Sequence, residues 1–173
     1  VKALRYYRAR ALLLPEGLAE GYRVDEERYW AHLKAAEICE RYVKDFHCAR
    51  SMWTHALRMD PKRADAAFYL GQHFRLIKMP RQSIGWLTVA SALPMPDRLN
   101  HQWPELYSCL RHVELLNAIA MLPSLRPRHV QQAASAQDTA SSGCAQEEAK
   151  MAGQMWKAIQ RKQVFEGKPP VPT

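Results

Sequence analysis

Cysteine and histidine side chains form the few pairs whose spacing could support chemistry. Cys109 and His112 lie three positions apart, so on a helix they share one face and offer a metal two ligands. Cys48, between His47 and His55, offers a nucleophile with a nearby base. A metal centre needs further ligands, and a thiol nucleophile needs a third group that orients its base. The sequence indicates neither, so we expect no catalytic residue, no metal and no cofactor.

Two other patterns that would indicate an enzyme are missing. Glu147 and Glu148 are adjacent, which places them on different faces of a helix, where they cannot work as a general acid and base pair. The seven glycines form neither a GxGxxG nor a GxxxxGK[ST] loop, the patterns that bring backbone close to phosphates. The sequence therefore favours a non-enzymatic protein.

Charge and composition restrict the kinds of partner. The 173 residues are 47% hydrophobic, enough for a buried core, and 25 Lys and Arg against 17 Asp and Glu give a net charge of +8. This excess favours an acidic partner, which is a nucleic acid, an anionic membrane or an acidic protein face. One local cluster without acids, at Lys2, Arg5, Arg8 and Arg10, is either a nucleic-acid footprint or a solvated helix face. No apolar run is long enough for a transmembrane segment.

The cysteines and the first residue bear on the compartment. Cys39, Cys48, Cys109 and Cys144 are far apart and lack CxxC spacing, so we expect reduced thiols and a reducing compartment, the cytoplasm or an organelle interior. The chain begins at Val1 without a methionine, which suggests a processed or partial sequence and is compatible with a cleaved organellar leader.

Apolar residues recur with a helical period almost everywhere, and no segment alternates with period two. The stripe Leu106, Leu110, Val113, Leu116 and Ile119 is the clearest example. The sequence predicts helices over residues 2–14, 26–42, 48–59, 63–76, 80–93, 104–121 and 145–165. The fold class is therefore all-α.

The composition changes after Leu122, which divides the chain. Residues 1–122 form the predicted helical repeat domain, and residues 123–143, rich in Ala, Ser and Gln, predict a linker or extended arm. Residues 144–166 predict a C-terminal helix. Residues 167–173 contain three prolines and predict an extended, polyproline-like tail.

A shift of 34 residues aligns one predicted helix with another. Ala49, Trp53 and Ala56 then fall on Ser83, Leu87 and Ala90, and Pro61 falls near Pro94 and Pro96. Small residues recur where helices must approach closely, and large residues recur where space must be filled. A constant period is expected of helix pairs that bury their apolar faces against neighbouring pairs.

These residues, with the segment LGQHF at 70–74, resemble the tetratricopeptide (TPR) repeat. The family marks its first helix by a Leu-Gly pair and an aromatic residue, its second by small and large positions, and its end by Pro. Glu37 stands where the family has a small residue, and residues 12–24 are too long for its usual turn. The resemblance implies an irregular right-handed stack of antiparallel helix pairs, an α-solenoid, followed by the arm and the extra helix.

A second resemblance covers residues 2–122. The order YYRAR, DEERYWAHLKAAE, ARSMWTHALRMDPKRADAAFYLGQHFR and ALPMPDRLNHQWPELYSCLRHVELLNA is similar to the repeat region attached to family 2 glycosyltransferases. In that family the catalytic α/β domain is separate, usually upstream, and carries an Asp-Xaa-Asp metal and nucleotide-sugar site. This chain has no Asp-Xaa-Asp, so no catalytic residue carries over.

Two surfaces are predicted to bind a partner. The resemblance to tetratricopeptide repeats implies a concave groove lined by first-helix residues, here Arg28, His32, Arg63, Tyr69 and His73. The C-terminal helix presents Met151, Met155, Trp156 and Ile159, which either anchor a neighbouring protein or fold back and cap the array.

The most consistent interpretation is a non-catalytic scaffold or subunit that mediates protein–protein interaction in a larger complex. Other protein subunits are then the expected partners, and nucleic acid is a further candidate. The alternative is the repeat portion of a glycosyltransferase whose catalytic domain lies upstream of this chain.

Overall fold

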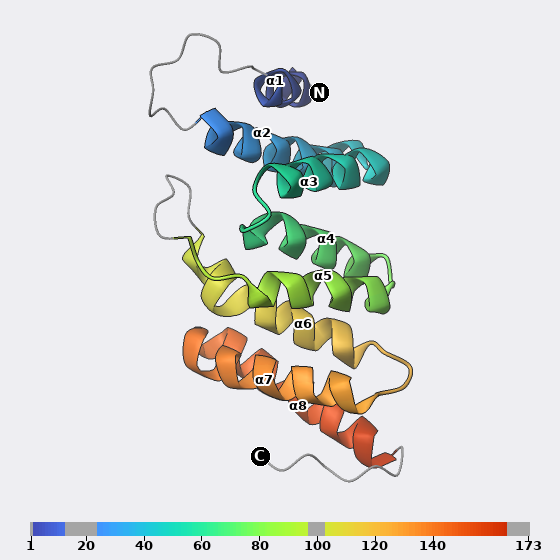
Figure 1. Cartoon of the computed structure of the whole chain (residues 1–173). Helices are drawn as coiled ribbons and strands as arrows, with labels where there is room; N and C mark the ends of the chain where they lie inside the picture. Colours follow the sequence, from blue (N-terminus) through green and yellow to red (C-terminus); the bar gives the residue numbers. More distant parts are fainter. Residues whose placement is uncertain (1, 13–23, 97–102, 166–173) are drawn as a thin grey trace. The chain divides into compact units, whose positions relative to one another are not determined.

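The computed structural model describes residues 2–12, 24–96 and 103–165, and every regular element in these ranges is a helix (Figure 1). This confirms the all-α fold class. The predicted proline-rich tail at 167–173 lies outside the described residues, as does most of the long segment 12–24. The chain divides into two compact units, one of residues 1–66 with 96–102 and one of residues 67–95 with 103–173. Each unit is described by itself.

The first unit contains three helices and the first turn of a fourth. α1 (Lys2–Ala11) packs against α2 (Val24–Ile38), and α2 packs against α3 (Phe46–Met59). α2 continues into a π-helical turn, η1 (Cys39–Val43), which ends where Lys44 adopts the left-handed conformation with φ of 60°. Asp45 then begins α3, because its carboxylate accepts a hydrogen bond from the Cys48 backbone N–H at 2.9 Å.

A buried ionic cluster joins α2 to the beginning of α4 (Ala64–Leu76). The Arg63 guanidinium lies 4.3 Å from the Tyr29 ring centre and donates to the Asp65 carboxylate at 3.2 Å. Glu26 approaches the same guanidinium at 3.9 Å, and the Tyr29 hydroxyl accepts from the Ala66 backbone N–H. Arg63 and Asp65 are buried, so these contacts compensate charges that have lost water.

The second unit holds the remainder of α4, α5 (Pro80–Ala92), the π-helical turn η2 (Leu106–Leu110) leading into α6 (Arg111–Ala120), α7 (Pro127–Gly143) and α8 (Gln146–Phe165). α4 and α5 approach closely because Gly71 leaves room for Leu87. A Cβ at Gly71 would lie 2.5 Å from the Leu87 Cγ. The Ser83 hydroxyl also donates to the Gly71 carbonyl at 2.7 Å. A small residue is therefore required at position 71.

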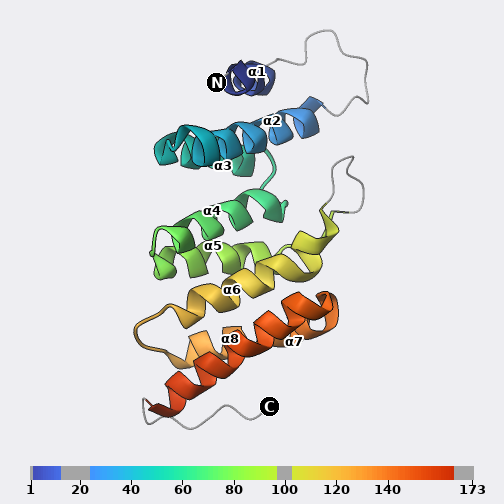
Figure 2. The same cartoon turned by 180° about the vertical axis from the view of Figure 1, so that it is seen from behind.

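α6 is the central helix of this unit. It packs against α5, α7 and α8, and Figure 2 shows it between α5 on one side and α7 with α8 on the other. The predicted apolar stripe is confirmed, since Leu106, Val113, Leu116 and Ile119 are buried and Leu110 is partly buried. The buried Arg111 donates to the carbonyls of Ala90 and Leu93, which supplies partners at the C-terminal end of α5.

The prediction of a linker or extended arm over residues 123–143 is wrong, because most of this segment is helical. α7 covers Pro127–Gly143, with Pro127 at a first helical position. Alanine is the best helix former, and Val130, Ala133, Ala136 and Ala140 bury one face of α7. Small side chains let α7 lie close to η2, where a Cβ at Gly143 would meet the Ser108 carbonyl oxygen. The segment is part of the second unit's core.

The expectation of four unpaired thiols is also wrong. Cys39 is bonded to Cys48, with Cα atoms 5.8 Å apart, and Cys109 to Cys144, with Cα atoms 4.8 Å apart. The hairpin between η1 and α3 brings the first pair together, and the packing of α7 on η2 brings the second pair together. The prediction of a reducing compartment rested on unpaired cysteines, so the two disulfides remove its support.

The residues aligned by the 34-residue shift have matching environments. Ala49, Trp53 and Ala56 in α3 are all buried, as are Ser83, Leu87 and Ala90 in α5. The same order of small, large and small side chains is therefore buried in each of the two helices.

Candidate anion-binding site

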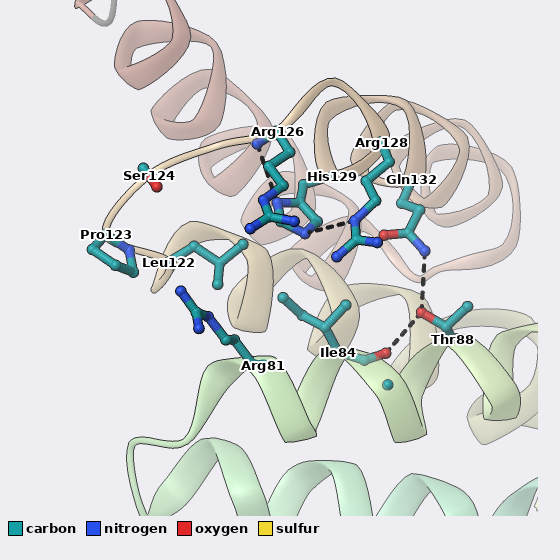
Figure 3. Close-up of a pocket in the computed structure, with 11 residues that line it drawn as sticks. Arg81, Ile84, Thr88, Leu122, Pro123, Ser124, Arg126, Arg128, His129 and Gln132 are labelled. Carbon is teal, nitrogen blue, oxygen red and sulfur yellow. Dashed lines mark hydrogen bonds between the residues drawn. The ribbon is translucent and has the colours of Figure 1, made fainter.

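A cavity of about 530 Å³ lies between α5, the segment joining α6 to α7, and the N-terminal end of α7. Figure 3 shows Arg81 and Thr88 on α5, with Arg126, Arg128 and Gln132 facing them. The full lining is Arg81, Ile84, Gly85, Thr88, Leu122, Pro123, Ser124, Arg126, Arg128, His129 and Gln132. Its volume is in the range of small-molecule and side-chain binding pockets.

The charged side chains that line this cavity are all positive. Arg81, Arg126 and Arg128 line it, and no Asp or Glu does. In the described part of the chain none of these three arginines forms an ion pair or a cation–π contact. Three exposed guanidinium groups therefore share one cavity without a compensating carboxylate, which produces a positive local potential.

His129 forms the buried wall between these arginines. Its Nδ1 accepts a hydrogen bond from the Arg126 backbone N–H at 3.2 Å, and its Nε2 lies 3.4 Å from the Arg128 Nε. Burial lowers the pKa of His129, and the charges of Arg128, Arg126 and Arg81 lower it further. Burial first, and the positive charges around the ring second, thus favour its neutral form.

A second cavity, of about 460 Å³, adjoins the first and continues along α5 and α7. The two share Thr88, Arg128 and Gln132, and the Gln132 side-chain amide donates to the Thr88 hydroxyl at 3.3 Å across the junction. The second cavity is lined by Thr88, Ser91, Ala92, His112, Leu115, Arg128, Gln131, Gln132, Ser135, Ala136 and Thr139. We call both cavities together the α5–α7 groove, and the part around Arg81, Arg126 and Arg128 its basic end.

The groove is suited to hold an anionic group at one end and, along the rest, a segment with both polar and apolar groups. Guanidinium groups present planar sets of donors to carboxylate and phosphate oxygens. Hydroxyl and amide side chains can both donate and accept, so they match a peptide backbone.

The three residues predicted to bind a partner from the first unit lie close together around α2. His32 is buried and its ring stacks on His55, with centroids 5.5 Å apart. Arg28 donates to the Ala11 carbonyl, and Arg63 belongs to the buried ionic cluster. His32 and Arg63 therefore pack within the unit, and only the partly exposed Arg28 retains accessible surface for the predicted role.

The predicted residues of the second unit also divide by burial. His73 is buried, whereas Tyr69 is partly exposed and lies against Trp103. On α8, Ile159 is buried, Met155 and Trp156 are partly exposed, and Met151 is exposed. α8 packs on α6 and α7, which favours the cap over the free anchor. A role in partner binding stays a prediction for all nine of these residues of the two units.

The residues first considered for thiol or metal chemistry are engaged elsewhere. Cys48 and Cys109 are in disulfides, and the buried His112 accepts a hydrogen bond from the Arg111 side chain. Among the described residues no group of three or more His, Cys, Asp or Glu side chains is placed to hold a metal ion. Of the helices in the described ranges, none has both the length and the apolar composition to cross a membrane.

Sequence reasoning did not identify the basic end of the groove. Arg126 and Arg128 stand in the segment LRPRH, which was interpreted as part of an arm, and Arg81 lies 45 positions before Arg126. That segment did contain a signal for a basic helix start. Pro127 favours the first turn of a helix, and Arg126, Arg128 and His129 lie within two positions of it. Only the packing of α7 near α5 brings Arg81 to them.

No protein-family model, no curated protein and no solved structure matches this chain. The resemblances to tetratricopeptide repeats and to the repeat region of family 2 glycosyltransferases therefore stay predictions.

Proposed function

We propose that this chain is a non-catalytic helical-repeat module that binds an acidic segment of another protein in the α5–α7 groove. The observation that carries the proposal is the basic end, where three arginines face one cavity and no carboxylate lines it. The continuation of the groove combines hydroxyl and amide side chains with apolar surface, which suits an extended segment of chain.

The repeat character of the module rests on its helix pairs. α4 with α5 and α6 with α7 follow each other along the chain within the second unit, and α8 covers the last pair. The matched burial at Ala49, Trp53 and Ala56 and at Ser83, Leu87 and Ala90 supports a repeated packing unit. A right-handed tetratricopeptide-like stack is the arrangement that we propose for these pairs.

Fluorescence anisotropy with a short fluorescein-labelled peptide rich in Glu and Ser tests the binding function. The intact chain should bind this peptide, binding should weaken as salt is added, and a peptide with Lys in place of Glu should not bind. The triple variant Arg81→Glu, Arg126→Glu, Arg128→Glu should abolish binding. The control Arg161→Glu reverses one exposed charge on α8 outside the groove and should retain it.

Three outcomes would overturn the proposal. The first is equal binding of the acidic and basic peptides, the second is full binding by the triple variant, and the third is no binding at low salt. Size-exclusion chromatography of native source material with mass spectrometry provides an independent measurement. Recovery of the chain only as a lone monomer would contradict a role as a subunit or scaffold.

A further inference from the structure

The basic end of the groove carries more positive charge than a carboxylate can balance. Arg81, Arg126 and Arg128 together present three guanidinium groups to one cavity. A Glu or Asp side chain supplies a single negative charge and two oxygens. A phosphomonoester supplies a charge of about −1.5 to −2 near neutral pH and three strong acceptor oxygens. The number of cations in the cavity therefore matches a phosphomonoester better.

His129 positions one of these arginines. The Arg128 Nε–H donates to the His129 Nε2 at 3.4 Å. A guanidinium has further N–H donors on its two terminal nitrogens. With its Nε held by His129, Arg128 presents these terminal donors beside the cavity that Arg81 and Arg126 also line.

The adjoining cavity supplies groups for the chain on either side of such a phosphate. Ser91, Gln131, Ser135 and Thr139 line it with hydroxyls and amides. The second cavity therefore offers hydrogen-bonding side chains to the peptide backbone on either side of a bound phosphate.

The same lining argues against a nucleic acid. Neither cavity has a Phe, Tyr or Trp side chain in its described lining, so unstacked bases would find no large aromatic ring to stack on. A phosphodiester group also carries only one negative charge, so it would balance less of the positive charge of the three arginines. A protein-borne phosphomonoester fits the cavity better on both counts.

We infer that the basic end of the α5–α7 groove binds a phosphorylated serine or threonine within the acidic segment of the partner protein. This inference rests on the proposed function, because it specifies the group that the bound segment carries. Arg81 approaches the phosphate from α5, Arg126 and Arg128 approach it from the start of α7, and His129 orients the last arginine.

The test compares four fluorescein-labelled peptides of one short Ala- and Gln-rich sequence whose central residue is phosphoserine, phosphothreonine, Glu or Ser. Anisotropy titrations of the intact chain should give a Kd for both phosphopeptides at least about tenfold lower than for the Glu peptide, because charge-assisted contacts to a dianion exceed those to a carboxylate. The Ser peptide should bind most weakly.

Two substitutions separate charge from geometry. Arg128→Lys keeps the positive charge but loses the planar donor set, so it should weaken phosphopeptide binding about tenfold. Arg126→Gln should weaken it at least as much, and Arg161→Gln should leave it unchanged. Circular dichroism checks that each variant keeps its helix content. Ser135→Ala, which changes a residue of the second cavity alone, supplies a further variant; it should weaken phosphopeptide binding while leaving competition by inorganic phosphate unchanged.

Each outcome decides the inference. Equal binding of the Glu peptide and the phosphopeptides would overturn it and leave the proposed function intact. No binding of any peptide would overturn both. Competition by single-stranded RNA at the same concentration as the phosphopeptide would assign the groove to nucleic acid, and equal competition by inorganic phosphate would assign it to a free anion.

Discussion

Arg63 illustrates how a fully buried charge is tolerated in this chain. Its guanidinium pairs with Asp65 and Glu26 and lies over the Tyr29 ring. We expect Arg63→Ala to lower the free energy of unfolding by about 3 to 5 kcal/mol, because Asp65 would keep its burial and lose its cation. Urea titration followed by circular dichroism measures this change. In the double variant Arg63→Met, Asp65→Leu the loss should be smaller than the sum of the single losses; additivity would contradict the coupling.

His32 and His112 make stability depend on pH. Burial lowers the pKa of each from 6.5 to about 4, with help from His55 at His32 and from Arg111 at His112. Between these two values the unfolded chain binds more protons than the folded chain, so the unfolding free energy falls as pH drops from 6.5 toward 4. Each histidine contributes about 2 to 3 kcal/mol to that fall.

Urea titrations of the intact chain across this pH range test the histidine contribution. His32→Gln should reduce the loss of stability on acidification by the share that His32 supplies. An identical profile for His32→Gln and the unmodified chain would contradict the assignment.

Close packing of α4 on α5 leaves little room for a side chain at Gly71. A Cβ at this position would lie 2.5 Å and 2.8 Å from atoms of the buried Leu87 side chain and 3.2 Å from its backbone nitrogen. Gly71→Ala should therefore lower the free energy of unfolding by about 1 to 3 kcal/mol through overpacking.

Gly153 in α8 is the matched control for Gly71, because nothing lies within 4 Å of an added Cβ. Gly153→Ala should raise the free energy of unfolding by about 0.5 to 1 kcal/mol, since alanine is the better helix former. Chemical denaturation of both variants gives the comparison. A stabilising Gly71→Ala would show that Leu87 moves aside without cost.

At the scale of elements, periodicity predicted most helices, and its failures have physical causes. The stripe from Leu106 to Ile119 was readable because large apolar residues repeat with the helical period. α7 was missed because Ala133, Ala136 and Ala140 are too small to stand out from the Ser and Gln around them, although alanine favours helix. The groove was missed because proximity of Arg81 to Arg126 depends on tertiary packing, which local patterns do not contain.

Across the whole molecule, two disulfides close loops of different length. The sequence separation is 35 for Cys109 and Cys144 and 9 for Cys39 and Cys48. In the loop-entropy description, removing the longer link should cost about 4 kcal/mol and removing the shorter about 2.5 kcal/mol. We therefore expect Cys109→Ser, Cys144→Ser to be less stable than Cys39→Ser, Cys48→Ser by about 1 kcal/mol.

Denaturant titration without reductant compares the two double variants. Maleimide labelling of the chain unfolded in denaturant without reductant is the necessary control, because the cysteines are then accessible, and it should modify no cysteine. Four reactive thiols would contradict both crosslinks and would restore support for a reducing compartment. The reverse order of stabilities would indicate that the loops are already restricted in the unfolded chain.

The link between Cys109 and Cys144 also has a mechanical consequence. If the chain were held at its ends and stretched, the stretch between these two residues would stay closed until the sulfur–sulfur bond broke. With 35 residues spanned, on the order of 120 Å of contour would be withheld from extension. α6 and α7 lie inside that closed stretch, so under load the wall of the groove formed by α7 remains tethered to η2 after other helices unravel.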